Sequence, residues 1–157
     1  MTQDRQLRRH PAHPSPVRRH NEPVIVLVTV CTYPRAKILA NASTVQALRT
    51  AWSVSDHWTV GTYVVMPDHV HLFCAPGRWD CAPVKNWARY WKRRVADEIP
   101  ALERIFQYDC WDTQMRSQSH YLRKLDYVRA NPVRKDLCTL AEDWPFSGTA
   151  TPLHWVL

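Results

Sequence analysis

The sequence predicts an α+β fold in which helices cover an antiparallel sheet. Short β-branched, apolar runs alternate with segments whose apolar residues recur at helical spacing. The resulting order of elements is strand, helix, strand, strand, helix, strand, helix, which is the split βαβ plan of a ferredoxin-like sandwich. With 157 residues, the chain is also long enough to bury one substantial core.

The first strand and the first helix are predicted from contrasting patterns. Residues 24–31, V-I-V-L-V-T-V-C, are apolar at nearly every position and rich in β-branched side chains, which is typical of an interior strand. Asn41 and the small polar residues after it offer caps for a helix over about 43–53. The apolar positions of this helix fall at helical spacing: Val45, Leu48, Ala51 and Trp52.

A β-hairpin is predicted next. Residues 58–66 form one apolar and aromatic run, and residues 69–75 form another. Pro67 and Asp68 lie between them and predict a turn, because proline fixes φ at the first central position of a turn. The two runs are therefore expected to be neighbouring antiparallel strands.

The second predicted helix, from about Cys81 to Glu98 with Asp80 as its cap, has two distinct faces. The apolar face should pack on the sheet: Val84, Trp87, Ala88, Trp91 and Val95. A cationic stripe follows the same period on another side: Lys85, Arg89, Lys92 and Arg93. Such a stripe is either a solvated face or a phosphate-binding surface.

The last predicted strand and helix lie beyond residue 104. Residues 105–115 are the strand candidate, and Ser117 or Ser119 begins a helix that runs to about Ala130. Pro132 is expected to end or bend this helix. We expect core contacts from Leu122, Leu125 and Val128, and from Trp144, Phe146 and Trp155 in a C-terminal segment that wraps around the domain.

Positive charge is concentrated near the N-terminus. The formal net charge is +7, and residues 1–20 supply more than half of it with five arginines and one aspartate. This segment is rich in proline and histidine and poor in apolar residues, which predicts a flexible basic arm over 1–22 and a single domain over 23–157. The arm either contacts phosphates or is a solvated terminus without a function. The net charge itself favours an anionic partner such as nucleic acid.

Cysteine usage and hydropathy indicate the compartment. The five cysteines are an odd number and include no C-x-x-C pair, which predicts free thiols in a reducing cytoplasm. The chain has no apolar stretch near the roughly 18 residues of a membrane span, and no signal-peptide pattern follows the basic N-terminus. We therefore expect a cytoplasmic protein without a membrane partner.

Two histidines interrupt the apolar strand in the segment M-P-D-H-V-H-L-F-C. Because alternate residues of a strand share a face, His69 and His71 point the same way, roughly 6.7 Å apart along the strand. Neutral imidazole is a common metal ligand, so the pair predicts half of a metal site. The alternative is an ordinary hydrogen-bonded pair, and the H-x-H spacing alone leaves both interpretations open.

A second polar group lies on the last predicted helix, in the segment L-D-Y-V-R-A-N-P-V. Tyr127 and Asn131 are four residues apart and therefore share one helix face, with His120 and Lys124 upstream on the same side. A helix packed on the sheet could present this phenol and amide to an ion held by the histidines. Alternatively, Tyr127 only packs and Asn131 only terminates the helix.

These two segments, together with T-V-C-T-Y-P-R and D-W-P-F-S, resemble the single-tyrosine transposases with an HUH motif, and most closely the REP-associated tyrosine transposases. The matched segments extend from about residue 24 to 147. The resemblance implies that His69 and His71 bind Mg²⁺ or Mn²⁺, that Asn131 is a third ligand, and that Tyr127 is the nucleophile. It also implies single-stranded hairpin DNA as the substrate of a monomer or homodimer, and a nucleoid-associated location within the cytoplasm.

We therefore expect a metal-dependent DNA endonuclease and strand transferase that works through a 5′-phosphotyrosine. Two alternatives stay open: a non-catalytic ferredoxin-like nucleic-acid-binding protein, and a metal-dependent nuclease that activates water. Eight cationic residues are the candidate phosphate contacts, in addition to the arm: Lys85, Arg89, Lys92, Arg93, Arg123, Lys124, Arg129 and Arg134.

Overall fold

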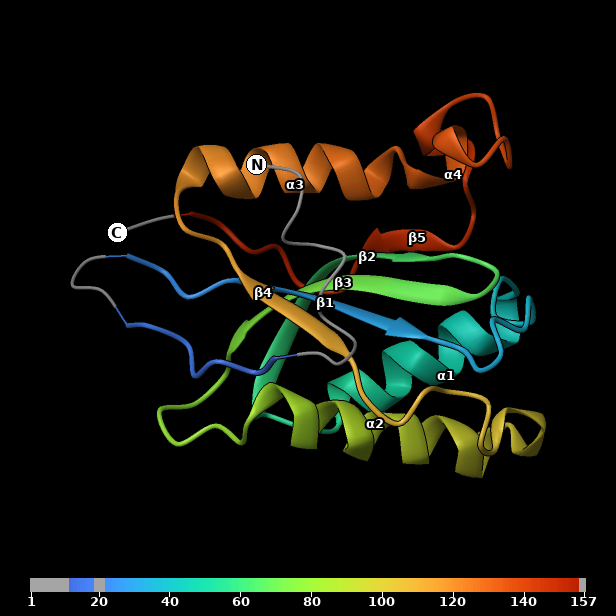
Figure 1. The fold of residues 1–157 in the computed structure, drawn as a ribbon, viewed down its shortest axis with the longest axis horizontal. Coiled ribbons are helices and arrows are strands. Elements are labelled where there is room, and N and C mark those ends of the chain that lie inside the picture. The colour runs from blue at the N-terminus through green and yellow to red at the C-terminus, as the bar shows by residue number, and fades with distance from the viewer. Residues whose placement is uncertain (1–11, 19–21, 156–157) are drawn as a thin grey trace.

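The computed structural model describes residues 12–18 and 22–155. A five-stranded sheet lies between two helices on one face, α1 and α2, and one long helix on the other, α3 (Figure 1). The elements in chain order are β1 (Val26–Cys31), α1 (Ala42–Ser53), β2 (Trp58–Val65), β3 (His69–Pro76), α2 (Val84–Glu98), the 3₁₀ turn η1 (Pro100–Leu102), β4 (Trp111–Gln114), α3 (Gln118–Arg129), α4 (Asn131–Arg134), the 3₁₀ turn η2 (Ala141–Asp143) and β5 (Ser147–Thr149).

The strand order is β4-β1-β3-β2-β5, and every neighbouring pair is antiparallel. The first four strands, with α1 and α2 as crossovers, confirm the predicted ferredoxin-like plan. β3 lies at the centre of the sheet, so both faces of this strand are covered. In the register of β1 with β3, Thr29 is opposite His71 and Cys31 is opposite His69. β5 extends the sheet from the segment that the sequence only predicted to wrap around the domain.

The main core lies between the sheet and the helices α1 and α2. The predicted apolar stripe of α2 is buried along its whole length. Trp91 is at its centre, with edge-to-face contacts to Trp52, Trp87 and Phe106 at ring-centroid distances of 6.0, 6.2 and 6.0 Å. From β3, Val70, Leu72 and Cys74 point into this core.

This aromatic packing predicts a large effect of one substitution. Trp91→Ala should lower the free energy of unfolding by about 3–5 kcal/mol, because it leaves a cavity among large rings. Tyr90→Ala removes the neighbouring ring, which is 41% exposed, and should cost less than about 1 kcal/mol. Urea unfolding of both variants measures the difference. Equal losses would show that the Trp91 cluster is not the centre of the core.

A second, smaller core lies between the sheet and α3. Tyr121 packs edge-to-face on Phe73 of β3 at 5.3 Å, and Leu125 and Val128 are also buried there. The prediction of Leu122 as a core residue was wrong, since its side chain is 49% exposed. Tyr121 takes that place, because residues 121, 125 and 128 follow the i, i+4, i+7 spacing of one helix face.

Two predicted boundaries were also wrong. α2 begins at Val84, since the Asp80 carboxylate pairs with Arg78 rather than capping the helix. Of the predicted strand over 105–115, only Trp111–Gln114 pairs with β1 as a strand, although Phe106 forms a single bridge with Thr32. In the intervening segment, the carbonyl groups of Gln107 and Tyr108 accept hydrogen bonds from the side chain of Lys92 on α2.

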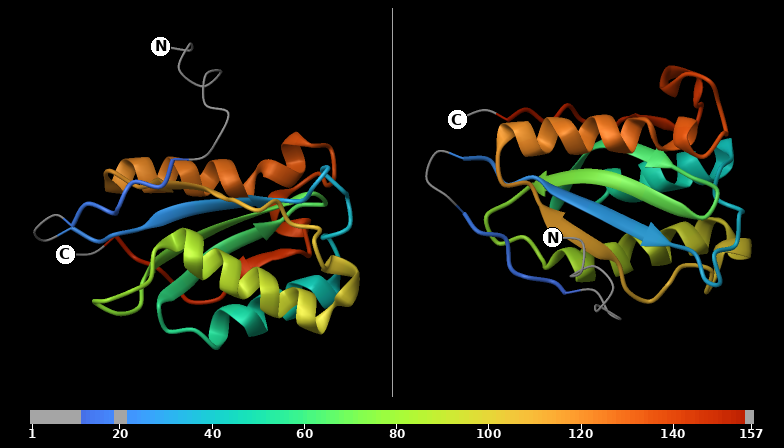
Figure 2. Two further views of the ribbon diagram at one scale, coloured as in Figure 1. Left: turned by 60° about the horizontal axis from the view of Figure 1, so that its bottom comes forward. Right: turned by 45° about the horizontal axis from the view of Figure 1, so that its top comes forward.

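The described part of the predicted basic arm, residues 12–18, runs beside the edge strand β4 (Figure 2). The backbone N–H of Val17 donates to the side-chain oxygen of Gln114, and the Gln114 amide donates back to the Val17 carbonyl. The rest of this segment, residues 1–11 and 19–21, lies outside the described residues. Over the described part of the chain, no helix is long and apolar enough to cross a membrane.

Candidate active site

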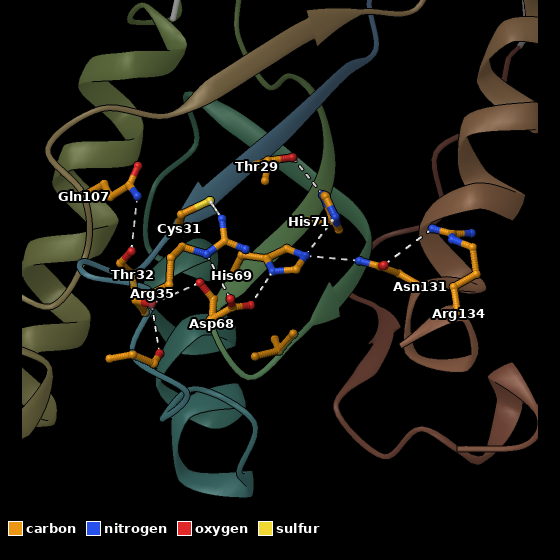
Figure 3. Close-up of polar contacts among 12 residues, drawn as sticks. Thr29, Cys31, Thr32, Arg35, Asp68, His69, His71, Gln107, Asn131 and Arg134 are labelled. Atoms are coloured by element: carbon orange, nitrogen blue, oxygen red, sulfur yellow. Dashed lines mark hydrogen bonds and ion pairs between the residues drawn. The ribbon is translucent and has the colours of Figure 1, made fainter. Parts of the chain in front are cut away.

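The two histidines of β3 converge on one point. The Nε2 atoms of His69 and His71 are 3.1 Å apart, and the two rings meet edge to face. Figure 3 shows both imidazoles beside the side chain of Asn131, which comes from the start of α4. The predicted alternation along the strand is confirmed, because Phe73 packs in the α3 core while the intervening residues point to the opposite face.

The outer nitrogen of each ring is held by a neighbouring side chain. His69 Nδ1 lies 2.7 Å from the Asp68 carboxylate. A carboxylate only accepts hydrogen bonds, so the ring hydrogen is on Nδ1 and the lone pair is on Nε2. His71 Nδ1 lies 2.8 Å from the hydroxyl of Thr29 on β1. Metal-binding histidines commonly have such a partner on the second nitrogen, because it fixes the tautomer and the ring orientation.

Asn131 completes the group. Its side-chain nitrogen lies 3.1 Å from His69 Nε2, and its oxygen lies 3.5 Å from an Arg134 guanidinium nitrogen. Rotating this amide by half a turn exchanges its oxygen and nitrogen at almost no cost in shape. The group can therefore offer two imidazole nitrogens and one amide oxygen to a cation.

The arrangement of lone pairs fits a cation. When both Nδ1 atoms carry hydrogens, both Nε2 atoms present bare lone pairs to each other at 3.1 Å. Asn131 donates to only one of them, His69. A divalent ion between the rings would satisfy both nitrogens, and imidazole with an amide oxygen is a donor set that Mn²⁺ and, less strongly, Mg²⁺ accept.

Electrostatics keep both rings neutral. Burial lowers the pKa of His69 below its usual value, although the hydrogen bond to Asp68 opposes the shift. Burial and the neighbouring His69 lower the pKa of His71 to about 3. Burial raises the pKa of Asp68, but hydrogen bonds from His69 and Arg35 outweigh it, so the carboxylate stays ionised. Neutral imidazole is the protonation state that metal binding requires.

The lowered pKa of His71 predicts a pH dependence of stability. Between pH 3 and 6.5 the unfolded state binds a proton that the folded state does not, so stability falls as the pH drops through this range. In metal-free buffer, the free energy of unfolding should lose about 1–2 kcal/mol more between pH 7 and 5 in the wild type than in His71→Asn. Urea titrations of both proteins at both pH values test this. Parallel pH dependences would contradict the neutral, buried state of His71.

Tyr127 is presented on α3, one turn before Asn131. Its side chain is 54% exposed, and the Arg134 guanidinium stacks 3.8 Å from the ring centroid. The Lys124 ammonium lies 5.6 Å from the same ring. The phenol is thus accessible to a substrate and is flanked by positive charge.

The structure divides the predicted phosphate contacts into two groups. Four lie on α3 and α4, near Tyr127, and the others lie on α2, on the opposite face of the sheet (Figure 1). The two groups therefore do not form one stripe. The group on α3 and α4 consists of Arg123, Lys124, Arg129 and Arg134, and the Tyr127 ring is in contact with Lys124 and Arg134.

The cationic stripe of α2 is only partly available to an anion. Lys92 is 9% exposed, and its ammonium donates to the carbonyl groups of Gln107 and Tyr108, so the prediction that it binds phosphate was wrong. Lys92 instead binds the segment before β4 to helix α2. Arg93 is exposed. Arg89 stacks on the Tyr108 ring at 4.3 Å, and Lys85 lies 3.6 Å from an Asp109 carboxylate oxygen.

The sequence interpretation missed two residues of the site. Thr29 is a lone hydroxyl in the apolar run of β1, and that polar interruption was the available signal for its contact with His71. The Arg35 side chain donates a hydrogen bond of 2.9 Å to the Asp68 carboxylate. The Arg35 backbone has a φ of 72°, a left-handed conformation that the sequence does not indicate.

Comparisons with known proteins find similarity to transposases. A solved structure of a REP-associated tyrosine transposase bound to a REP hairpin is similar with a TM-score of 0.68 and 25% identity, over 85% of this chain and 82% of that one. The REP-associated tyrosine transposase of Escherichia coli (strain K12) is 27% identical over 88 residues, or 56% of this chain. This chain is similar in sequence and fold to the REP-associated tyrosine transposases.

The match to the Escherichia coli REP-associated tyrosine transposase spans about half of that protein, 52% of its length. A crystal structure of a putative transposase from Deinococcus radiodurans R1 matches with a TM-score of 0.47 and 16% identity, over 79% of this chain and 97% of that one. No protein-family model matches the chain. The likeness to REP-associated tyrosine transposases agrees with the resemblance that the motifs indicated.

Proposed function

We propose that this protein is a DNA strand transferase that cleaves and rejoins single-stranded hairpin DNA, with Tyr127 as the nucleophile. One observation carries the proposal: His69 Nε2 lies 3.1 Å from both His71 Nε2 and the Asn131 amide nitrogen, and Asn131 is one helical turn from an exposed tyrosine. A histidine pair with only a structural role would not need Asp68 and Thr29 on the two Nδ1 atoms, which turn both Nε2 lone pairs toward one point.

In the proposed reaction the Tyr127 hydroxyl loses its proton and attacks a phosphodiester phosphorus. The new bond joins the phenol oxygen to the 5′-phosphate, while the bond to the 3′-oxygen breaks and that oxygen leaves as a 3′-hydroxyl after taking up a proton. The number of phosphoester bonds does not change. The same 3′-hydroxyl, or another one, can therefore attack the phosphotyrosine and join strands without ATP.

The residues present fit a divalent ion, Mg²⁺ or Mn²⁺, held by His69, His71 and the rotated amide of Asn131. When bound, such an ion supplies positive charge to a phosphate oxygen during the displacement. The protein's own contribution is the fixed direction of the two Nε2 atoms, which Asp68 and Thr29 impose on the rings.

Cationic side chains of the chain support the same step. Arg134 stacks on the Tyr127 ring and also contacts the Asn131 oxygen, so one guanidinium links the nucleophile to the predicted ion site. The Lys124 ammonium also lies near this ring, 5.6 Å from its centroid. Positive charge held near a phenol stabilises the phenolate that forms as it attacks.

The active site is proposed to be assembled within one chain. α3 packs on the sheet of its own chain through Tyr121 and Phe73, and α4 places Asn131 beside His69. Hairpin DNA is proposed as the substrate because the similar solved transposase is bound to a REP hairpin and because this chain carries a net charge of +7.

The test uses end-labelled single-stranded oligonucleotides that carry a hairpin with randomised flanking nucleotides, and unpaired oligonucleotides of equal composition as controls. The proposal predicts cleavage of hairpin substrates and a covalent protein–DNA band on a denaturing gel in Mn²⁺ or Mg²⁺, both of which EDTA removes. Metal-dependent cleavage without a covalent band would show a nuclease that activates water. Salt-sensitive binding with no cleavage of any flank would support a non-catalytic DNA-binding protein.

A further inference from the structure

A second group of metal-ligating side chains lies at the other edge of the molecule, between the N-terminal segment and β4. His13, Cys110 and Asp112 each offer one ligand atom, and these atoms all lie within 4.8 Å of one another. Cys110 directly precedes β4 and Asp112 lies within it, so the two side chains, two residues apart, share one side of the strand. His13 comes from the N-terminal segment, 97 residues before Cys110 and 99 before Asp112.

The imidazole of His13 is held from both sides. Its Nε2 atom lies 2.7 Å from an Asp109 carboxylate oxygen, and its Nδ1 atom contacts the carboxylate of Asp112. Since a carboxylate accepts hydrogen bonds and does not donate them, Asp109 can accept a hydrogen bond from the N–H at His13 Nε2. Nδ1 then presents its lone pair toward Asp112 and Cys110, in the way that a carboxylate commonly orients a metal-binding histidine.

The group is sheltered from solvent. Cys110 is 2% exposed, and the side chain of Asp112 is 8% exposed. Without a bound cation, the site keeps two aspartates close together, and they form ion pairs with His13, when it is protonated, and with Lys85. One imidazole nitrogen, one sulfur and one carboxylate oxygen are all donors that Zn²⁺ accepts at tetrahedral sites.

We propose that His13 Nδ1, Cys110 Sγ and Asp112 form a Zn²⁺ site, with Asp109 positioning the imidazole. The thiol ligand distinguishes it from the His69 and His71 group, since sulfur favours zinc over magnesium. The bound ion fastens the N-terminal segment to the edge strand β4. This covers an edge that otherwise presents unpaired backbone groups.

Cobalt substitution tests the ligands, because Co²⁺ bound to a thiolate gives an intense near-ultraviolet charge-transfer band that histidine and carboxylate ligands do not give. One equivalent of Co²⁺ added to the metal-free protein should produce this band, and Zn²⁺ should remove it by displacement. Cys110→Ser should abolish the band. Cys31→Ser is the matched control, since Cys31 is the thiol opposite His69, and it should leave the band unchanged.

Two further variants separate a metal site from a simple ion-pair clamp. His13→Asn, in a segment outside the core, should weaken Co²⁺ binding at least about tenfold, and Asp109→Ala should weaken it by about 10–100-fold. A metal-free clamp, in which a protonated His13 pairs with both aspartates, predicts no band in any protein. Absence of the band in the wild type, or its persistence in Cys110→Ser, overturns the proposal.

Limited proteolysis tests the fastening itself. In the wild type, Zn²⁺ should slow trypsin cleavage after Arg18 at least about fivefold, because metal coordination strengthens the hold of His13 beyond the contacts that His13, Val17 and Arg18 already make. His13→Asn should be cleaved at one rate with and without Zn²⁺. Equal protection by Zn²⁺ in both proteins would show that the ion does not act through His13.

Discussion

Replacing Tyr127 with phenylalanine is expected to abolish the covalent protein–DNA adduct and to reduce strand cleavage by about 10³-fold or more. The substitution removes only the hydroxyl that attacks phosphorus. The ring, its stacking on Arg134 and the half-exposed helix surface remain. Binding of hairpin DNA should therefore change less than about threefold. A denaturing gel for the adduct and a filter-binding titration for affinity measure the two effects separately.

Tyr121→Phe is the matched control on the same helix. The Tyr121 side chain is buried, and its hydroxyl donates to the Leu153 carbonyl at 3.2 Å, so it is not available to attack DNA. This variant should keep adduct formation while losing about 1 kcal/mol of stability. If Tyr127→Phe cleaves as well as the wild type, the tyrosine is not the nucleophile and activated water becomes the better explanation.

Replacing His71 with alanine is expected to have the second-largest effect. It removes one of the two nitrogens that face each other at 3.1 Å, so Mn²⁺ affinity should fall by more than about 100-fold and cleavage should fall with it. Isothermal titration with Mn²⁺ measures the affinity directly. Raising the metal concentration should restore little activity, because one imidazole and one amide form an incomplete ligand set.

Thr29→Val tests the outer partner of the same ring. The hydroxyl contacts His71 Nδ1 at 2.8 Å, and its loss frees the ring to rotate without removing the ligand. Mn²⁺ affinity should fall by about 10–100-fold, less than in His71→Ala. Unchanged metal dependence in both variants would contradict a metal site at this pair and would leave the histidines as structural residues.

Much of the fold could be predicted because its elements have strong local patterns. The apolar stripe of α2 and the hairpin of β2 and β3 follow from helical and strand periodicity, and the structure confirms both. β5 has only three residues, one of them Gly148, and depends on pairing with β2, so no local pattern predicts it. The predicted strand over 105–115 was shortened by a tertiary contact, the bonding of Lys92 to backbone carbonyls.

The candidate active site was partly predictable for the same reason. His69 and His71 share a face because strand periodicity is two, and Tyr127 and Asn131 share one because they are four residues apart on a helix. The contact of Thr29 with His71 depends on the register of β1 against β3, which the sequence does not encode locally. His13 could not be grouped with Cys110 for a similar reason, since only the path of the chain beside β4 brings them together.

The most direct test of the central claim is peptide mapping of the covalent product by tandem mass spectrometry. The wild type is incubated with cleavable hairpin DNA and Mn²⁺, then digested with nuclease and trypsin. The proposed mechanism predicts a nucleotide 5′-phosphate attached to Tyr127, in a peptide that Tyr127→Phe does not yield. A nucleotide on another residue, or cleavage products with no modified peptide, would contradict the assignment of Tyr127 as the nucleophile.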